Sequence, residues 1–199
     1  STAATCSGWS TPKGRCMQVR ETAIPGVLIV EPRVLRDARG FFVETYHADR
    51  YAAAGIADAF VQDNHSRSQR GTLRGLHWQW RRPQGKLVRA VEGEIFDVAV
   101  DLRPESPTFG RWVGVTLSAD DFRQLYVPPG LAHGFYVTSA NAQVEYKCTD
   151  VYDPEGEQGM RWDDPDLAIA WPLSEPPILS ARDQRHPSMR ELFPDRLTP

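Results

Sequence analysis

Three basic side chains of different chemistry occur close together in residues 71–86. Arg74, His77 and Lys86 alternate there with apolar residues and glycines, which indicates a partly buried β-type segment. An unpaired buried charge costs several kcal/mol, so such a cluster needs carboxylates of the same chain or an anionic ligand as partners. Surface salt bridges would explain a lone arginine. An arginine, a histidine and a lysine together in such a segment indicate a binding or catalytic site.

The five histidines divide into two groups by their surroundings. His77 and His133 each lie among apolar residues and glycines, whereas His47 and His65 have polar neighbours typical of turns or the surface. His186 lies in a polar tail beside a proline and is set aside. His77 and His133 are therefore the candidates for chemistry.

A metal site needs three or four convergent ligands. A metal-binding cupin would carry a His-x-His pair with a glutamate a few residues on, but Trp78 and Gln79 follow His77. The pattern predicts no metal site.

Acid–base chemistry needs a histidine with an orienting carboxylate and a second proton-transfer group across the substrate. In the strand expected at 142–149, Val144, Tyr146 and Cys148 share one face, so Tyr146 points with the apolar side chains towards the interior. A buried tyrosine is most often a core residue, and that interpretation stays open. Periodicity does not choose among the carboxylate candidates, which are Asp97, Asp163, Asp164 and Asp183.

Short strands must position these residues. Apolar runs bounded by turn residues predict strands at 27–30, 41–45, 86–91, 94–102, 111–117, 123–127 and 142–149, and residues 47–59 have helical composition. Residues 153–199 are proline-rich and irregular, with a short helix at the end. The pattern predicts an all-β domain over 19–199, built as a closed barrel or a two-sheet jelly roll, after a loose extension at 1–18.

Composition excludes several classes of protein. The chain has 199 residues, 41% hydrophobic content and a net charge of −3, so it lacks the basic character of nucleic-acid-binding proteins. It has no apolar run of about 18 residues that could span a membrane and no signal-peptide pattern. Cys6, Cys16 and Cys148 form no Cys-x-x-Cys pair. Cys6 and Cys16 could bridge in an oxidising compartment, but we expect free thiols in the cytoplasm.

Several motifs, in order from about residue 24 to residue 183, resemble the dTDP-4-dehydrorhamnose 3,5-epimerase family. They are QDNHS (62–66), LRGLH (73–77), QGKLV (84–88), FDVAVD (96–101), SPTFG (106–110), PPGLAHGF (128–135), YK (146–147) and LSARD (179–183). Arg182 stands where some members carry lysine, and Trp78 replaces a smaller aromatic residue; both changes preserve the residue type.

The resemblance implies a jelly-roll, cupin-like fold without metal or other cofactor. It also implies a homodimer that acts on a dTDP-4-keto-6-deoxy sugar. Matched by position, His77 resembles the base, Asp183 its orienting carboxylate, Tyr146 the acid on the opposite face and Lys86 the cation beside the C4 oxygen. The matched substrate-binding positions are Arg39, Glu44, Gln62, Asn64, Arg74, His133, Tyr152, Glu157 and Arg182.

One feature of the matched segment conflicts with a regular strand. Arg74 and His77 have opposite parity, so a regular strand would send them to opposite faces. We predict a bulge or similar irregularity at Gly75 that brings both to the same side.

Three functions fit the resemblance. The first is epimerisation at both C3 and C5 in dTDP-L-rhamnose synthesis. The second is epimerisation at only one of these carbons in a related dTDP-4-keto-deoxysugar. The third is a non-catalytic cupin that binds a nucleotide sugar. Retention of His77, Lys86, Tyr146 and Asp183 together argues against a pure binder, which needs neither an acid nor a base.

Overall fold

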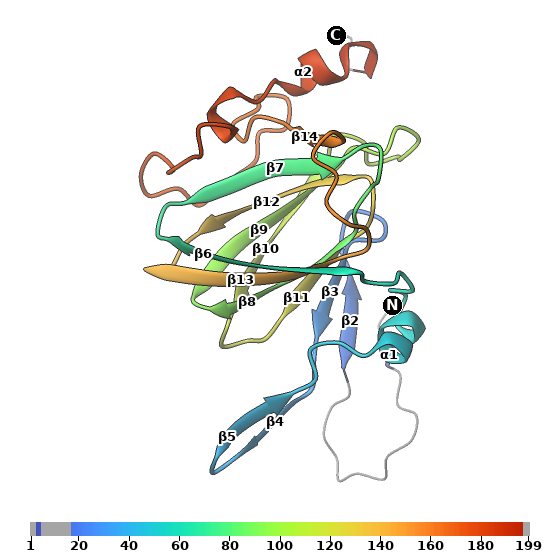
Figure 1. The fold of residues 1–199 in the computed structure, drawn as a ribbon, viewed down its shortest axis with the longest axis vertical. Helices are drawn as coiled ribbons and strands as arrows, with labels where there is room; N and C mark the ends of the chain where they lie inside the picture. The colour runs from blue at the N-terminus through green and yellow to red at the C-terminus, as the bar shows by residue number, and fades with distance from the viewer. Residues whose placement is uncertain (1–2, 5–16, 197–199) are drawn as a thin grey trace.

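Two antiparallel sheets form the body of the protein (Figure 1). The computed structural model describes residues 3–4 and 17–196. One sheet has the order β1 (Ala3–Ala4), β2 (Gln18–Glu21), β3 (Leu28–Glu31), β11 (Gln124–Val127), β8 (Lys86–Glu92), β13 (Asn141–Cys148) and β6 (Gln62–Gln69). The other has the order β10 (Trp112–Ser118), β9 (Glu94–Asp101), β12 (Leu131–Val137), β7 (Leu73–Gln79) and β14 (Glu157–Gly159).

The main core lies between the two sheets. Alternate residues of each strand point inward, so Val88, Leu125 and Val144 of the first sheet meet Ala99 and Phe135 of the second. Burial of each large apolar side chain contributes roughly 2 kcal/mol, which explains why the apolar strands identified in the sequence pair in this way. The arrangement confirms the predicted all-β, jelly-roll (cupin-like) fold.

The C-terminal segment covers the outer face of the second sheet. Val98 and Leu76 point to that face and contact Met160, Leu167 and Met189. This segment is irregular, as expected, apart from short helices: η1 (Asp183–Arg185), α2 (Met189–Leu192) and η2 (Pro194–Arg196). It runs along β14 and β7 at the top of Figure 1. Because both faces of this sheet are covered, the site residues on β7 and β12 are partly shielded from water.

A short helix covers part of the first sheet. The helix expected at 47–59 is present only as α1 (Ala48–Ala53), because the chain turns at Gly55, which has φ of +97°. Tyr51 of α1 packs against Val30 and Tyr126. Neither α-helix in the described residues is long and apolar enough to span a membrane.

A separate hairpin leaves the body of the protein near α1. It consists of β4 (Val34–Asp37) and β5 (Gly40–Val43), which pair only with each other within the described residues. Phe41 and Phe42 on this hairpin are 57% and 68% exposed. The hairpin projects from the end of the molecule opposite β7 and β14 (Figure 1).

Several strands are absent from the sequence prediction, among them the short strands β2, β4 and β14. Residues 62–69 form β6, which the search for apolar runs misses because all eight residues are polar; an edge strand of this kind is half exposed and needs no apolar face. β12 is buried along its whole length and was also absent from the predicted strands. Most of the extension expected at 1–18, including Cys6 and Cys16, lies outside the described residues; Ala3–Ala4 pair with Gln18–Val19.

β7 carries the irregularity predicted at Gly75. His77 pairs with His133 but Arg74 pairs with Phe135, so the register shifts between them. Gly75 has φ of +119°, a conformation that residues with a side chain rarely adopt. A Cβ atom there would lie 2.6 Å from the Cα of Gly134 and 2.8 Å from the carbonyl oxygen of His133. The close approach of these backbones therefore requires glycine.

We expect Gly75→Ala to destabilise the protein by about 2 kcal/mol or more, because it combines backbone strain with an unrelieved clash. The free energy of unfolding in urea measures this loss. Gly40→Ala is the matched control, since Gly40 also has a positive φ (+128°) but nothing lies within 4 Å of its missing Cβ. An equal loss in both variants would show that the contact with Gly134 is unimportant.

Candidate active site

A cavity of about 420 Å³ opens between the two sheets and the C-terminal segment. Strands β6, β7, β8, β12 and β13 and the segment 178–183 supply its walls. Its lining residues are Ser66, Thr72, Leu73, Arg74, His77, Lys86, His133, Phe135, Tyr146, Ile178, Leu179, Ser180, Arg182 and Asp183. Both Arg74 and His77 face this cavity, as the predicted irregularity requires.

His77 and Asp183 form a hydrogen-bonded pair in the cavity. The Nε2 atom of His77 lies 2.6 Å from Oδ1 of Asp183, whose side chain is 4% exposed. The hydroxyl of Ser180 donates to the other carboxylate oxygen at 2.8 Å and accepts from the amide of Asp183 at 3.0 Å. Both carboxylate oxygens therefore have a partner.

Backbone hydrogen bonds hold Asp183 next to a strand that precedes it by more than 100 residues. Ile178 pairs with the chain just before β7: its amide donates to the carbonyl of Gly71 at 2.8 Å, and its carbonyl accepts from the amide of Leu73 at 3.0 Å. The η1 turn then begins at Asp183. This clamp selects Asp183 from the four carboxylate candidates.

The pair has the electrostatics of a base with an orienting anion. Burial alone would raise the pKa of Asp183, but the hydrogen bond and the charge of His77, with Ser180, hold it below its ordinary value. The carboxylate is therefore ionised at neutral pH and accepts a hydrogen bond from the Nε2–H group of His77. This tautomer leaves Nδ1 of His77 with a free lone pair, so it can take a proton.

The other three carboxylate candidates have structural partners. Asp97 is fully buried and lies 2.8 Å from Nε2 of His133. Asp163 pairs with Arg161 on the surface, and Asp164 accepts from the amide of Met189 at the start of α2.

A lysine without a counter-ion faces the cavity. Lys86, on β8, forms no ion pair within the part of the chain that the structure describes. Burial lowers the pKa of Lys86, although Cys148, Asp97 and Glu157 partly offset this. Burial likewise lowers the pKa of His133, more than Asp97 raises it, so this histidine is neutral beside the lysine. Lys86 is thus placed to bind a negative charge that forms in the cavity.

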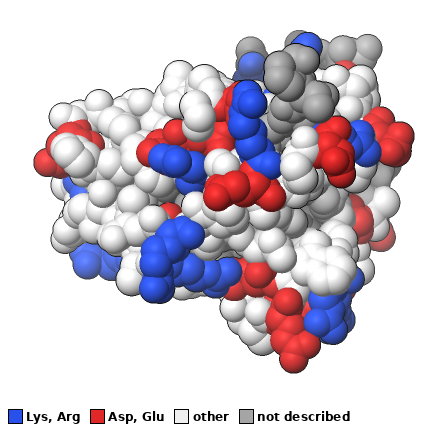
Figure 2. Space-filling view, turned by 90° about the horizontal axis from the view of Figure 1, so that it is seen from above, with Lys and Arg blue, Asp and Glu red and all other residues white. Residues whose placement is uncertain are grey.

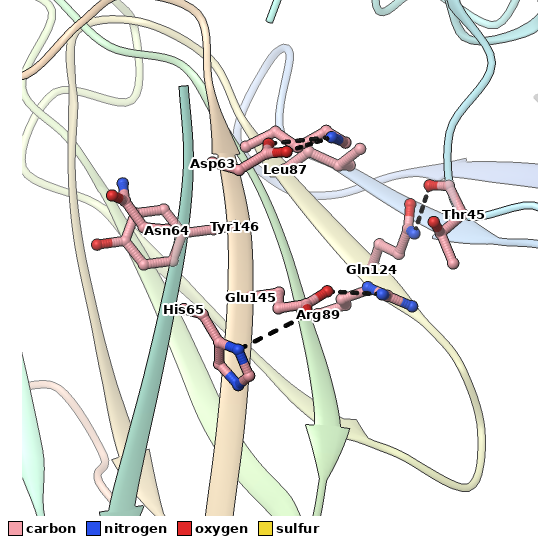
Figure 3. A pocket seen from close by; sticks show the side chains of 10 residues that line it. Thr45, Asp63, Asn64, His65, Leu87, Arg89, Gln124, Glu145 and Tyr146 are labelled. Atoms are coloured by element: carbon pink, nitrogen blue, oxygen red, sulfur yellow. Dashed lines mark hydrogen bonds and ion pairs between the residues drawn. The ribbon is translucent and has the colours of Figure 1, made fainter. Parts of the chain in front are cut away.

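Tyr146 supplies a neutral hydroxyl from a different wall. It leaves β13 on the opposite side from Glu145 (Figure 3), which confirms the face expected from strand alternation. Burial raises the pKa of Tyr146, so the phenol stays protonated at neutral pH. Its ring lies 6.4 Å from that of His133.

A chain of hydrogen bonds connects Arg182, which lines the cavity, to four matched residues that are not among its lining residues: Gln62, Asn64, Tyr152 and Glu157. The hydroxyl of Tyr152 donates to Glu157 at 2.6 Å, and Arg182 contacts the same oxygen at 2.5 Å. The amide of Tyr152 donates to the side chain of Gln62 at 2.8 Å, and Gln62 donates to Asn64 at 3.1 Å. Burial would raise the pKa of Glu157, but Tyr152 and Arg182 lower it overall. Five residues expected to bind substrate are therefore connected.

Arg74 lies within the same cavity. Its Nε donates to Ser68 at 3.0 Å, which leaves the two terminal nitrogens of the guanidinium free of hydrogen bonds to the described residues. A guanidinium of this kind can bind two phosphate oxygens at once.

Arg39 and Glu44 are not brought to the cavity. Arg39 lies at the turn of the β4–β5 hairpin, where it pairs with Asp37 and its side chain is 90% exposed. Glu44 follows β5 and pairs with Arg50 of α1. The hairpin projects away from the strands that line the cavity (Figure 1).

His186 is a site residue that the sequence reasoning missed. Its Nε2 lies 3.3 Å from Oδ1 of Asp183, and its side chain is 9% exposed. In the sequence, His186 was marked only by its position three residues after Asp183. The surrounding segment is irregular, so hydrophobic periodicity could not predict where this side chain points. Potential ligand atoms of His77, Asp183 and His186 lie within 4.8 Å of one another. The 2.6 Å contact between the first two is the geometry of an imidazole–carboxylate hydrogen bond.

A second hollow lies on the other side of the first sheet (Figure 3). Most of its charged side chains are already paired: Arg89 donates to Glu145 at 2.6 Å and Lys147 to Asp63 at 3.0 Å. On the face seen from above (Figure 2), acidic and basic side chains lie side by side, without a continuous basic surface. Within the described residues, the second hollow therefore lacks the unpaired lysine that the first cavity offers.

The first cavity can perform a defined kind of chemistry. It combines a histidine base held by a carboxylate, a cation with no partner and a neutral phenol. A C–H bond beside a carbonyl becomes acidic when a nearby cation stabilises the enolate oxygen, and a phenol can return a proton. The arrangement therefore suits proton removal and return next to a carbonyl group.

Comparison with known proteins agrees with this chemistry. A dTDP-4-dehydrorhamnose 3,5-epimerase of Pseudomonas aeruginosa is 55% identical over 170 residues, which cover 85% of this chain and 94% of that protein. A solved structure of the Legionella pneumophila dTDP-6-deoxy-D-glucose-3,5-epimerase, in complex with dTDP-4-keto-L-rhamnose, has a TM-score of 0.85 and 54% identity, and the match covers 86% of this chain and 92% of that one.

A second solved structure is also similar to this chain. It is a 4-keto-6-deoxy sugar epimerase from the novobiocin biosynthetic gene cluster of Streptomyces spheroides, with a TM-score of 0.87 and 40% identity over 97% of both chains. The family model described as dTDP-4-dehydrorhamnose 3,5-epimerase matches residues 21–191. That match spans every residue of the cavity, and the chain belongs to the dTDP-4-dehydrorhamnose 3,5-epimerase family.

Proposed function

We propose that this protein epimerises C3 and C5 of dTDP-4-dehydro-6-deoxy-D-glucose to give dTDP-4-dehydro-L-rhamnose, a step of dTDP-L-rhamnose biosynthesis. The observation that carries the proposal is the His77–Asp183 pair in one cavity with Lys86 and Tyr146. The identity of 55% with a 3,5-epimerase supports the choice of reaction.

Each inversion has two proton transfers. Nδ1 of His77 removes the proton from the carbon beside the C4 ketone, and the electron pair moves to the C4 oxygen. Lys86 stabilises the enolate oxygen by its charge. Tyr146 then returns a proton to the same carbon from the opposite face, and the ketone re-forms. Because the proton lost is replaced, the reaction has no net oxidation or reduction and needs no redox cofactor.

Asp183 supports the base at both stages. Its ionised carboxylate fixes the tautomer of His77 before the reaction and stabilises the imidazolium after it. His133, held neutral by burial, is assigned to contact the sugar beside Lys86.

We assign the remaining matched residues, in the cavity and beside it, to the nucleotide sugar. The free guanidinium nitrogens of Arg74 suit the diphosphate. Tyr152 is 51% exposed, so its ring is accessible for stacking on thymine. Gln62, Asn64, Glu157 and Arg182 form the hydrogen-bonded network behind Tyr152 and are assigned to substrate binding.

Arg39 and Glu44 fit the same assignment only in a homodimer. We infer that the β4–β5 hairpin of one copy reaches the cavity of its partner, where Arg39 contacts the nucleotide. The exposed rings of Phe41 and Phe42 support this, because a projecting apolar hairpin is best covered by protein. The cytoplasm is the proposed compartment, where Cys148 would remain the free, buried thiol seen here.

A second candidate is epimerisation at only one carbon. A protein of Streptomyces bikiniensis described as a 3'-monoepimerase is 34% identical and has the same fold, with a TM-score of 0.80. The catalytic groups required at C3 and at C5 are the same types, so the position of the sugar in the cavity decides how many carbons react. A non-catalytic nucleotide-sugar binder is the third candidate.

Hydrogen exchange from heavy water into dTDP-4-keto-6-deoxyglucose, followed by NMR, tests the reaction. We expect deuterium at both C3 and C5, and we expect His77→Asn to slow both exchanges by about 10³-fold, because the variant removes the general base. His65→Asn is the matched control, since His65 is exposed on β6 and lies near Glu145 rather than in the cavity. Exchange at one carbon would identify a single-site epimerase, and tight binding without exchange would identify a binder.

Tyr146→Phe separates proton removal from proton return. We expect exchange at C3 to persist while formation of inverted product falls by about 10²-fold, because the phenol acts only after the enolate forms. The ratio of exchange to inversion, measured in the same sample, checks this. Tyr136→Phe is the control, since Tyr136 is a buried core residue whose hydroxyl has no partner among the described residues. An unchanged ratio in Tyr146→Phe would show that another group returns the proton.

Complementation between inactive variants tests the hairpin. Arg39→Ala and His77→Asn are each expected to be nearly inactive, but co-expression should restore about a quarter of the wild-type activity. Half of the randomly formed dimers are mixed, and each mixed dimer has one intact site of two. If Arg39 acts within its own chain, or if the protein is a monomer by light scattering, no activity returns.

A further inference from the structure

His186 is closely packed beside the His77–Asp183 pair. A Cβ atom on Gly159 would collide with the His186 ring, so the ring lies directly on the backbone of that glycine. Gly159 belongs to β14 and is the pairing partner of His77 on β7. The ring of His186 also meets that of His77 edge to face, with centroids 5.5 Å apart and an interplanar angle of 75°. Strand pairing thus holds the two imidazoles against each other.

The Nε2 atom of His186 points at the carboxylate oxygen of Asp183 that is hydrogen-bonded to His77. Its Nε2 lies 3.3 Å from Oδ1 of Asp183, the atom that His77 approaches to 2.6 Å. This nitrogen is buried and has no aligned hydrogen bond within the described residues. A buried imidazole nitrogen without a full partner is costly, unless it interacts with the nearby carboxylate.

The charges around His186 keep it neutral. His77 from β7, Asp183 from η1 and Arg182 beside η1 face it, and Glu157 of β14 lies beyond Arg182. Burial lowers the pKa of His186, the charges of His77 and Arg182 lower it further, and Asp183 offsets only part of this effect. His186 is therefore neutral beside Asp183 at neutral pH.

We propose that His186 is a positioning residue for the base: its neutral Nε2–H group shares Oδ1 of Asp183 with His77 and thereby limits how strongly the carboxylate holds the imidazolium. The role in turnover rests on the proposed epimerase reaction. A base that serves two carbons in turn must release its proton between them, and a carboxylate with another donor stabilises the imidazolium less.

Two substitutions distinguish this role from simple packing. His186→Phe keeps a ring over Gly159 but removes the donor, whereas His186→Gln keeps an N–H donor. In His186→Phe, His77 no longer shares Oδ1 of Asp183 with a second donor, which favours the charged form of His77. The acidic limb of the kcat/KM profile should therefore move to higher pH by about half a unit, and His186→Gln should return it close to wild type.

NMR of isotope-labelled histidine makes the test independent of turnover. The titration midpoint of His77, followed without substrate, should shift upward in His186→Phe and not in His186→Gln. An unchanged midpoint in His186→Phe, or equal shifts in the two variants, would overturn the proposal, whatever the enzyme does with its substrate. If only the exchange assay failed while the shift appeared, the proposed reaction would be wrong and the positioning role would stand.

The wild-type protein provides a measurement that needs no variant to fold. Nitrogen chemical shifts should show His186 neutral at pH 7 with its proton on Nε2. A charged His186, or a proton on Nδ1 instead, would leave Asp183 without the second donor and would contradict the proposal.

Discussion

The buried hydrogen bond between His77 and Asp183 is the interaction on which the rest of the site depends. A carboxylate that is 4% exposed would be strongly unfavourable without partners. Ser180 and His77 supply those partners, and the backbone pairing of Ile178 with the chain before β7 brings them together. The irregular C-terminal segment is therefore tied to β7, because its buried carboxylate is hydrogen-bonded to His77.

The need to direct His77 into the cavity also explains why β7 is irregular. A regular strand cannot direct both Arg74 and His77 into one cavity, and the register shift at Gly75 removes this conflict. The shift is possible because Gly75 and Gly134 let two backbones approach closely. Arg74 and His77 thus face one cavity although they belong to one short segment, and residue 75 between them has no room for a side chain.

The distribution of charge in the cavity separates it from an ordinary polar core. His133 is paired with Asp97, and Arg182 is paired with Glu157, which also accepts from Tyr152. Lys86 has no such partner among the described residues, and burial makes its charge costly. Such a group lowers the energy of the state in which an anion forms beside it, which is the purpose of a preorganised site.

The sequence alone determined the all-β class, most strands, the alternation that turns Tyr146 inward and the irregularity at Gly75, because these follow from local periodicity and steric rules. Its motifs also indicated the family. Local rules did not find β6, whose residues are all polar, since an edge strand needs no apolar face. Nor could they select Asp183 or find His186, because contacts between β7 and a segment about 100 residues away depend on how the chain folds back. Only the tertiary structure decided those contacts.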